Sequence, residues 1–151
     1  MRLMIIHLSD IHITCSEDAI LSRKEQIVAA IKNLDYELDR CLIAITGDLA
    51  QSGTQEQYLI AFEFIASLVD LLKKNLPRKN GKPEVSVEVV AVPGNHDCHL
   101  PTDKPDGARI NILDSIIKDR KIISDISVQE LCLQPQQNFF SFLEAATPYI
   151  K

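Results

Sequence analysis

The sequence lacks the features that would place the chain in a membrane or outside the globular class. No apolar run reaches the about 18 residues that a membrane-spanning helix needs. The apolar stretch over residues 1–6 is too short, and too soon followed by polar residues, to predict a signal peptide. There is no internal repeat and no low-complexity segment. These absences exclude a fibrous or disordered chain, and we expect a cytoplasmic protein.

Paired cysteines are also missing. The four cysteines are scattered and form no Cys-x-x-Cys pair, which excludes a small disulfide-stapled domain. Without an export signal, we expect reduced thiols, each acting as a small buried hydrophobic residue. They are Cys15, Cys41, Cys98 and Cys132.

An excess of positive charge is absent as well. The 151 residues include 16 basic and 21 acidic ones, giving a net charge of −5, which argues against a general nucleic-acid coat. The sequence nevertheless contains one basic cluster. It could be a phosphate-binding patch or a set of solvated cations near a helix end, and we favour the solvated cations. Nucleic acid is therefore not a favoured partner. The cluster comprises Lys73, Lys74, Arg78, Lys79 and Lys82.

What is present is an ordinary globular composition, with 46% hydrophobic and 25% charged residues. Three apolar runs predict strands at Leu3–Leu8, Cys41–Thr46 and Val85–Val92. The third is nearly continuous in β-branched residues, which suits a parallel strand covered on both faces.

Helical patterns lie between these runs. The capping boxes Ser22-x-x-Glu25 and Thr54-x-x-Gln57 predict two helix starts. The first helix has an apolar stripe of Ile27, Val28, Ile31 and Leu34. The second has an apolar stripe of Tyr58, Phe62, Ile65, Val69 and Leu72. Pro77 and Gly81 are expected to end this second helix. The resulting order, strand–helix–strand–helix–strand, predicts an α/β fold with a parallel sheet.

The remainder of the chain predicts a helical segment. Residues 93–107 have the composition of a loop. A helix is expected around Ile110–Ile117, a third capping box, Ser127-x-x-Glu130, opens a short helical turn, and a last helix stops before Pro148. Lys121–Ile126 is the only weak candidate for a fourth strand.

The residues that could carry chemistry follow the three predicted strands. Asp10 and His12 follow the first, Asp48 follows the second, and Asn95 and His96 follow the third. Because ligands of open parallel sheets bind beyond the carboxyl ends of the strands, we expect these side chains to meet at one edge. Oxygen and imidazole donors together suit Mn, Fe, Zn or a similar divalent ion.

The residue types suggest separate tasks within such a site. Asp48 has two carboxylate oxygens and could bridge two metal ions, while Asn95 offers a neutral oxygen. His96 would be free to give or take a proton. Gly47, Gly53 and Gly94 fit tight turns and a close approach of the backbone to an anion.

In order and context, the motifs D-x-H, G-D and G-N-H-D resemble those of the calcineurin-like metallophosphoesterase superfamily, chiefly over residues 1–98. The resemblance implies the N-terminal portion of a β-sandwich flanked by helices. It also implies a phosphoester hydrolase with two divalent metal ions about 3.5–4 Å apart and an attacking metal-bound hydroxide. Asp10 and His12 would bind the first metal, Asp48 would bridge both, Asn95 would bind the second, and His96 would be the catalytic proton donor.

Details of the motifs indicate which branch of the superfamily the chain resembles. The third motif ends in Asp97, whereas the family's protein Ser/Thr phosphatases have Glu there, and the arginine of their second motif is absent. The run Leu8–His12, and Gly53 followed by Tyr58, look like the class III cyclic nucleotide phosphodiesterases. The substrate implied is a phosphoester, possibly of a nucleotide. The related DNA-repair nucleases usually carry a further histidine after the second motif, which this chain lacks.

The chain is short of the family's later histidine ligands. Its four histidines are His7, His12, His96 and His99, and no G-H-x-H motif follows them. We expect His7 to pack as a structural residue and His99 to be an ordinary loop residue. We therefore expect the chain to be the N-terminal part of a longer protein, with a metal-binding core over 1–98 and a helical insertion or cap over 99–151. We also expect it to have low activity alone. The alternatives are a degenerate or regulatory binding domain and a nuclease subunit.

Overall fold

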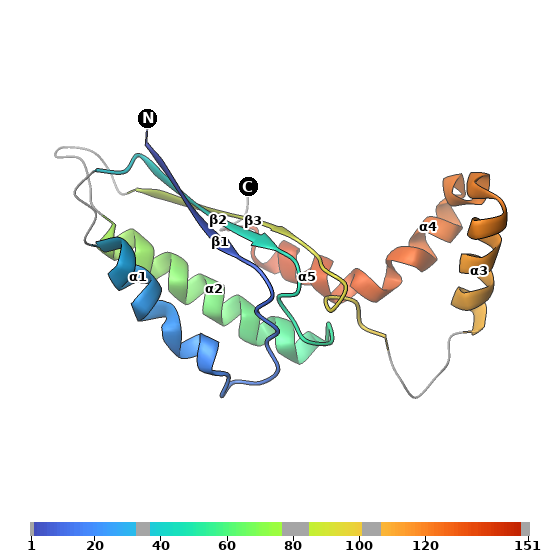
Figure 1. Ribbon diagram of the computed structural model, residues 1–151, viewed down its shortest axis with the longest axis horizontal. Coiled ribbons are helices and arrows are strands. Elements are labelled where there is room, and N and C mark those ends of the chain that lie inside the picture. The colour runs from blue at the N-terminus through green and yellow to red at the C-terminus, as the bar shows by residue number, and fades with distance from the viewer. Residues whose placement is uncertain (1, 33–36, 77–84, 101–106, 149–151) are drawn as a thin grey trace.

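A computed structural model describes residues 2–32, 37–76, 85–100 and 107–148. Three strands and their connecting helices come first, and a helical segment follows (Figure 1). The strands are β1 (Leu3–Leu8), β2 (Arg40–Thr46) and β3 (Ser86–Val92). The α-helices are α1 (Lys24–Lys32), α2 (Gln55–Asn75), α3 (Gly107–Lys118), α4 (Ile126–Leu133) and α5 (Gln137–Ala145), and the 3₁₀ helices are η1 (Ala19–Arg23), η2 (Arg120–Ser124) and η3 (Gln134–Gln136).

The three strands form one parallel sheet in the order β1-β2-β3. Leu8 pairs with Ile45 at the end of β1, and Thr46 pairs with Val92 at the end of β2. The predicted α/β fold and strand order are confirmed, and the strand boundaries shift by one residue at most. All three strands end at the same edge of the sheet, so the loops that follow them lie together.

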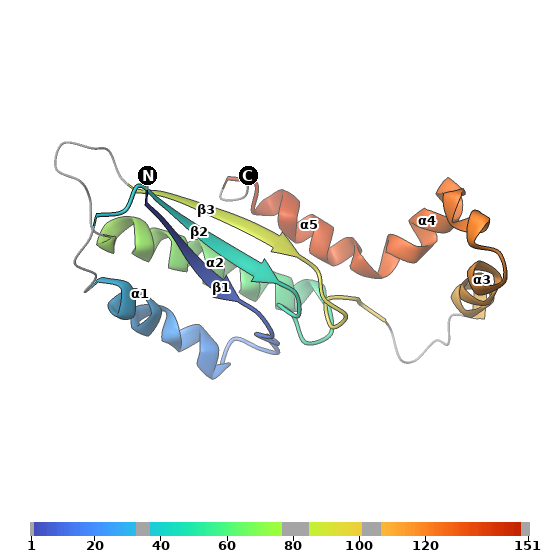
Figure 2. The same cartoon turned by 45° about the horizontal axis from the view of Figure 1, so that its top comes forward.

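The hydrophobic core lies between the sheet and the helices on one of its sides. Figures 1 and 2 show α1 and α2 on the same side of the sheet. Ile43 and Val89 of the strands and Leu68 and Leu72 of α2 are fully buried in this core. The apolar stripe predicted for α2 is buried here as well, apart from the partly buried Phe62.

The opposite face of the sheet differs from expectation. Val92 of β3 and Ile5 of β1 point to this face and are 56% and 60% exposed, so the prediction that the third strand is covered on both faces is wrong for the described part of the chain. The continuous apolar pattern of β3 is real, but burial also needs a second layer. Among the described residues no such layer shields these two side chains.

The predicted capping boxes have different outcomes. Thr54 caps α2, because its Oγ1 accepts a hydrogen bond from Gln57 N at 3.4 Å. Ser22 lies inside η1 and donates to Ala19 O instead, so the chain turns helical earlier than predicted. The N-cap of α4 is Asp125, whose carboxylate accepts from Ser127 N at 2.9 Å, and not Ser127 itself.

We expect Thr54→Ala to destabilise the protein by about 1 kcal/mol, because the first turn of α2 loses its side-chain acceptor. Urea unfolding measures this difference. Thr54→Ser keeps an acceptor oxygen at the same place and serves as the control. Equal stability of the alanine and serine variants would show that the cap contributes little.

The segment after β3 is helical, as predicted, and the weak strand candidate Lys121–Ile126 is wrong, because residues 121–124 belong to η2 and Ile126 begins α4. Figures 1 and 2 show α3 and α4 away from the sheet, while α5 returns toward it. Phe139 and Phe142 of α5 are buried beside Tyr58 of α2, with the Tyr58 and Phe142 rings stacked at 5.5 Å. The last helix therefore joins the core of the sheet domain.

The four cysteines are free thiols, but only Cys41 is fully buried. Burial raises the pKa of the Cys41 thiol to about 11, so it stays protonated at neutral pH. Cys15 is exposed, and Cys98 and Cys132 are partly buried. The prediction of a buried role is thus wrong for Cys15, which lies in a surface turn beside Asp18.

No helix in the described ranges is both long enough and apolar enough to cross a bilayer.

Candidate functional site

The loops after β1 and β2 run side by side beyond the sheet. Asp10 N donates to Gly47 O at 3.3 Å, and His12 N donates to Asp48 O at 2.9 Å. Ile13 continues this parallel pairing with a bridge to Ala50. His12 and Asp48 are therefore neighbours because the strand pairing extends past the ends of the strands.

Three of the predicted site residues have a left-handed backbone. The φ angles are 53° at Asp10, 53° at His12 and 52° at Asp48. Non-glycine residues rarely adopt this conformation, which costs about 1–3 kcal/mol and clusters at functional sites. The strain lies where the motifs predict ligands, which supports a functional role for this edge of the sheet.

The loop after β3 joins the other two through His96. Its backbone N donates to Asp48 Oδ1 at 2.9 Å, and its ring Nδ1 lies 2.9 Å from Gln51 O. A carbonyl oxygen only accepts, so Nδ1 must carry the hydrogen of this bond. His96 Nε2 is then the ring atom left to meet a ligand or to exchange a proton.

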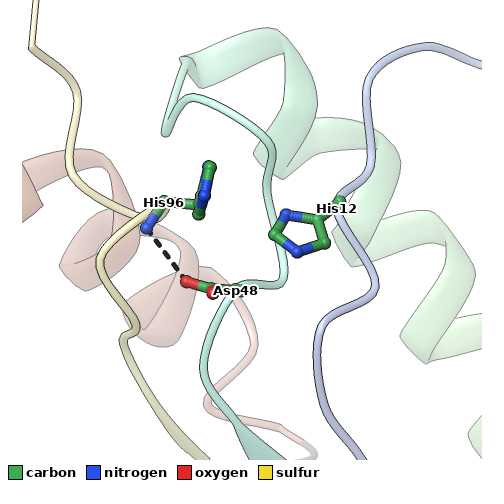
Figure 3. Close-up of side chains that lie close together, drawn as sticks. All are labelled: His12, Asp48 and His96. Atoms are coloured by element: carbon green, nitrogen blue, oxygen red, sulfur yellow. Dashed lines mark hydrogen bonds between the residues drawn. The ribbon is translucent and has the colours of Figure 1, made fainter.

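His12, Asp48 and His96 form the cluster shown in Figure 3. Their candidate ligand atoms all lie within 4.8 Å of one another. The His12 and His96 rings meet edge to face, with centroids 4.7 Å apart. His12 Nδ1 is buried and has no hydrogen-bond partner among the described residues. Two imidazoles, one of which has this unpartnered buried nitrogen, and a carboxylate fit a divalent metal ion.

The other two predicted ligands lie next to this cluster in sequence: Asp10 is not a member of the group, and Asn95 directly precedes His96. Asp10 is exposed, and its carboxylate accepts a hydrogen bond from Ser9 Oγ. Asn95 is also exposed, and its backbone carbonyl accepts from Cys98 N at 3.4 Å. The structure thus brings together His12, Asp48 and His96, while Asp10 and Asn95 flank them on the same loops.

Glycine is required where the second and third loops touch. Gly47 has a φ of +96°, and a Cβ added there would lie 3.0 Å from Gly94 Cα. A Cβ at Gly94 would overlap Asp48 Oδ1 and lie 2.5 Å from Asp48 N. The sequence predicted a close approach to an anion at these glycines, and the group that Gly94 approaches is the Asp48 side chain.

The remaining histidines lie outside the cluster. His7 is exposed on the open face of the sheet, so its predicted packing is wrong, although its Nε2 shares a 2.6 Å hydrogen bond with Thr46 Oγ1. His99 is an exposed loop residue, as predicted, and its Nδ1 lies 3.3 Å from Ser52 O.

Asp97 has a place in the site that sequence reasoning missed. It is fully buried, and its carboxylate accepts hydrogen bonds from Ala50 N and Gly94 N at 2.9 Å each. The available signal was the acidic residue directly after the Asn95-His96 pair, a position that also distinguishes branches of the family.

Comparison with known proteins agrees with this geometry. The sequence model for calcineurin-like phosphoesterases matches residues 3–146. The chain belongs to this family. Its members typically bind divalent metals, and the cluster around Asp48 is a potential ligand group for such an ion.

A relative within this phosphoesterase family is a 3′,5′-cyclic-nucleotide phosphodiesterase of Nostoc sp. strain PCC 7120. The two sequences are 32% identical over 106 residues, which cover 66% of this chain and 33% of the relative. The chain therefore spans about a third of the length of the relative it matches.

Proposed function

We propose that the chain provides the metal-binding part of a phosphoesterase that hydrolyses phosphoester bonds. The observation that carries this proposal is the cluster of His12, Asp48 and His96, with its buried unpartnered nitrogen, at the carboxyl edge of the sheet. The family and its cyclic-nucleotide phosphodiesterase member support it. The substrate class is a phosphodiester or phosphomonoester, and a nucleotide is the favoured form.

Each residue has a separate role in this proposal. Asp10 and His12 would hold one divalent ion, Asp48 would be shared with a second, and Asn95 would complete the second site from the neighbouring loop. When bound, the metal pair supplies a hydroxide at neutral pH and offsets the charge of the transition state. The chain's four histidines limit its nitrogen donors, so we expect low turnover from this chain alone.

His96 acts as the proton donor to the leaving oxygen. His96 Nδ1 donates a hydrogen bond to Gln51 O, which fixes the orientation of the ring and leaves Nε2 for the substrate. Positioned acids and bases contribute about 10²–10⁴-fold to rate. The His96 backbone N–H also binds Asp48 Oδ1, so the proton donor and the bridging carboxylate are held together.

We expect His96→Asn to lower kcat by about 10²–10⁴-fold, with a small effect on the Kd for Mn²⁺. Single-turnover hydrolysis of a chromogenic aryl phosphodiester with added Mn²⁺ measures the rate, and calorimetry measures the Kd. His99→Asn, the same change three residues further along the same loop, is the control. A large loss of Mn²⁺ affinity in His96→Asn would make His96 a ligand and remove its role as proton donor. Absence of Mn²⁺ binding by the wild-type chain would contradict the proposed function itself.

A further inference from the structure

Asp97 is a completely buried carboxylate that accepts four hydrogen bonds at its oxygens. Oδ1 accepts from Ala50 N and from Tyr58 Oη, at 2.9 Å each. Oδ2 accepts from Gly94 N at 2.9 Å and from Leu49 N at 3.3 Å. An ionised carboxylate offers about four acceptor positions and no donor, so these four donors match its full capacity. We refer to Asp97 and these four donors as the Asp97 network.

Three of the four donors in the Asp97 network come from the two loops that carry the site, and the fourth, Tyr58, belongs to α2. Leu49 and Ala50 directly follow Asp48, and Gly94 lies two residues before His96. One carboxylate therefore binds the backbone on both sides of the contact between His96 N and Asp48 Oδ1. Hydrogen bonds to a charged group are shorter and stronger than neutral ones, so the two loops are held in one relative position.

We propose that Asp97 is a positioning residue, which sets the placement of Asp48 against His96 and so controls the affinity of the site for a divalent ion. The proposal rests on the metal-binding function proposed above. Asp97 itself is buried behind the loops, and its oxygens are taken up by the network, so it acts through Asp48 and His96 and does not bind the ion.

Tyr58 extends the Asp97 network into the core. Its hydroxyl lies 2.9 Å from Asp97 Oδ1 and 3.2 Å from Asp97 O, and its ring stacks on Phe142 of α5. Burial, followed by the nearby charge of Asp97, raises the pKa of Tyr58, so its hydroxyl stays a donor. Asn138 of α5 also donates to Gly53 O at 2.8 Å, so α5 supports the loop after β2 at a second point.

The test is Asp97→Asn, which keeps the size of the side chain but replaces one acceptor oxygen with an amide group that cannot accept. We expect the Kd for Mn²⁺, measured by calorimetry, to rise by about 10–100-fold. Leu68→Ala, in the buried face of α2, is the control for general destabilisation. Both variants are measured well below their melting temperatures, and the control should keep the wild-type Kd. An unchanged Kd in Asp97→Asn, or an equal change in Leu68→Ala, would overturn the proposal.

A second measurement separates this proposal from the proposed function. In the metal-free protein, NMR signals of the His96 ring nitrogens report the hydrogen bond from Nδ1 to Gln51 O. We expect these signals to move in Asp97→Asn and to stay in place in Leu68→Ala. If the wild-type chain binds no Mn²⁺, the proposed function fails, and these signals still decide whether Asp97 positions His96. If Asp97→Asn does not fold, Tyr58→Phe removes one donor only, and unchanged His96 signals and Kd in that variant would count against the Asp97 network.

Discussion

Replacing Asp48 with asparagine is expected to weaken Mn²⁺ binding by more than about 100-fold, because loss of an outer hydrogen-bond partner of a ligand already costs about 10–100-fold. Asp48 is the only carboxylate of the His12–Asp48–His96 cluster. The substitution removes its negative charge and one of its two oxygens. The remaining amide oxygen can still accept a hydrogen bond from His96 N, so we expect the loop after β3 to keep its position.

Calorimetry and metal content after gel filtration measure the effect of Asp48→Asn. Asp114→Asn is the matched control, because it makes the same chemical change on the exposed surface of α3. We expect that variant to bind Mn²⁺ as the wild type does. If Asp48→Asn retained the wild-type metal content, the assignment of Asp48 as a bridging ligand would be wrong.

Gly94→Ala is expected to damage both stability and metal binding. The added methyl group would overlap Asp48 Oδ1, and Asp48 N is only 2.5 Å away, so the two loops must separate. Overpacking of this kind typically costs about 1–3 kcal/mol. The displaced Asp48 carboxylate would also leave its place beside His12, and we expect the Kd for Mn²⁺ to rise in parallel.

Gly107→Ala is the control for Gly94→Ala, because a Cβ at Gly107 has no atom within 4 Å. Chemical denaturation and Mn²⁺ titration of both variants give the comparison. Gly107→Ala should match the wild type in both measurements. A Gly94→Ala variant with wild-type stability and Kd would show that the loops can separate without cost, which would also weaken the case for the Asp97 network.

The sequence predicted the sheet well because its signals are local. Runs such as Leu3–Leu8 are bounded by polar residues, and β-branched residues of β3 favour a strand whatever surrounds it. Helix starts were harder to predict. Ser22 and Ser127 match the pattern of a cap, but Asp18 and Asp125 precede the elements that begin there, and several polar residues in a row compete for the same role.

For the candidate site, the sequence predicted the common edge better than the detailed geometry. Strand ends and motif order brought His12, Asp48 and His96 to one edge, but no local pattern showed that Asp10 lies outside their cluster. The role of Asp97 depends on donors from residues 49, 50 and 58, far from it in sequence. Contacts of this range form only when the loops are packed, so a motif alone cannot display them.

The left-handed backbone at Asp10, His12 and Asp48 limits the evolutionary substitutions open to the site. Aspartate, asparagine and histidine are the non-glycine residues that most often adopt this conformation, and all three can also coordinate a metal ion. Glutamate and cysteine would also offer ligand atoms but suit this backbone less well, while glycine would relax the backbone and remove the proposed ligand. Backbone conformation and coordination chemistry thus favour the same few residue types at these positions.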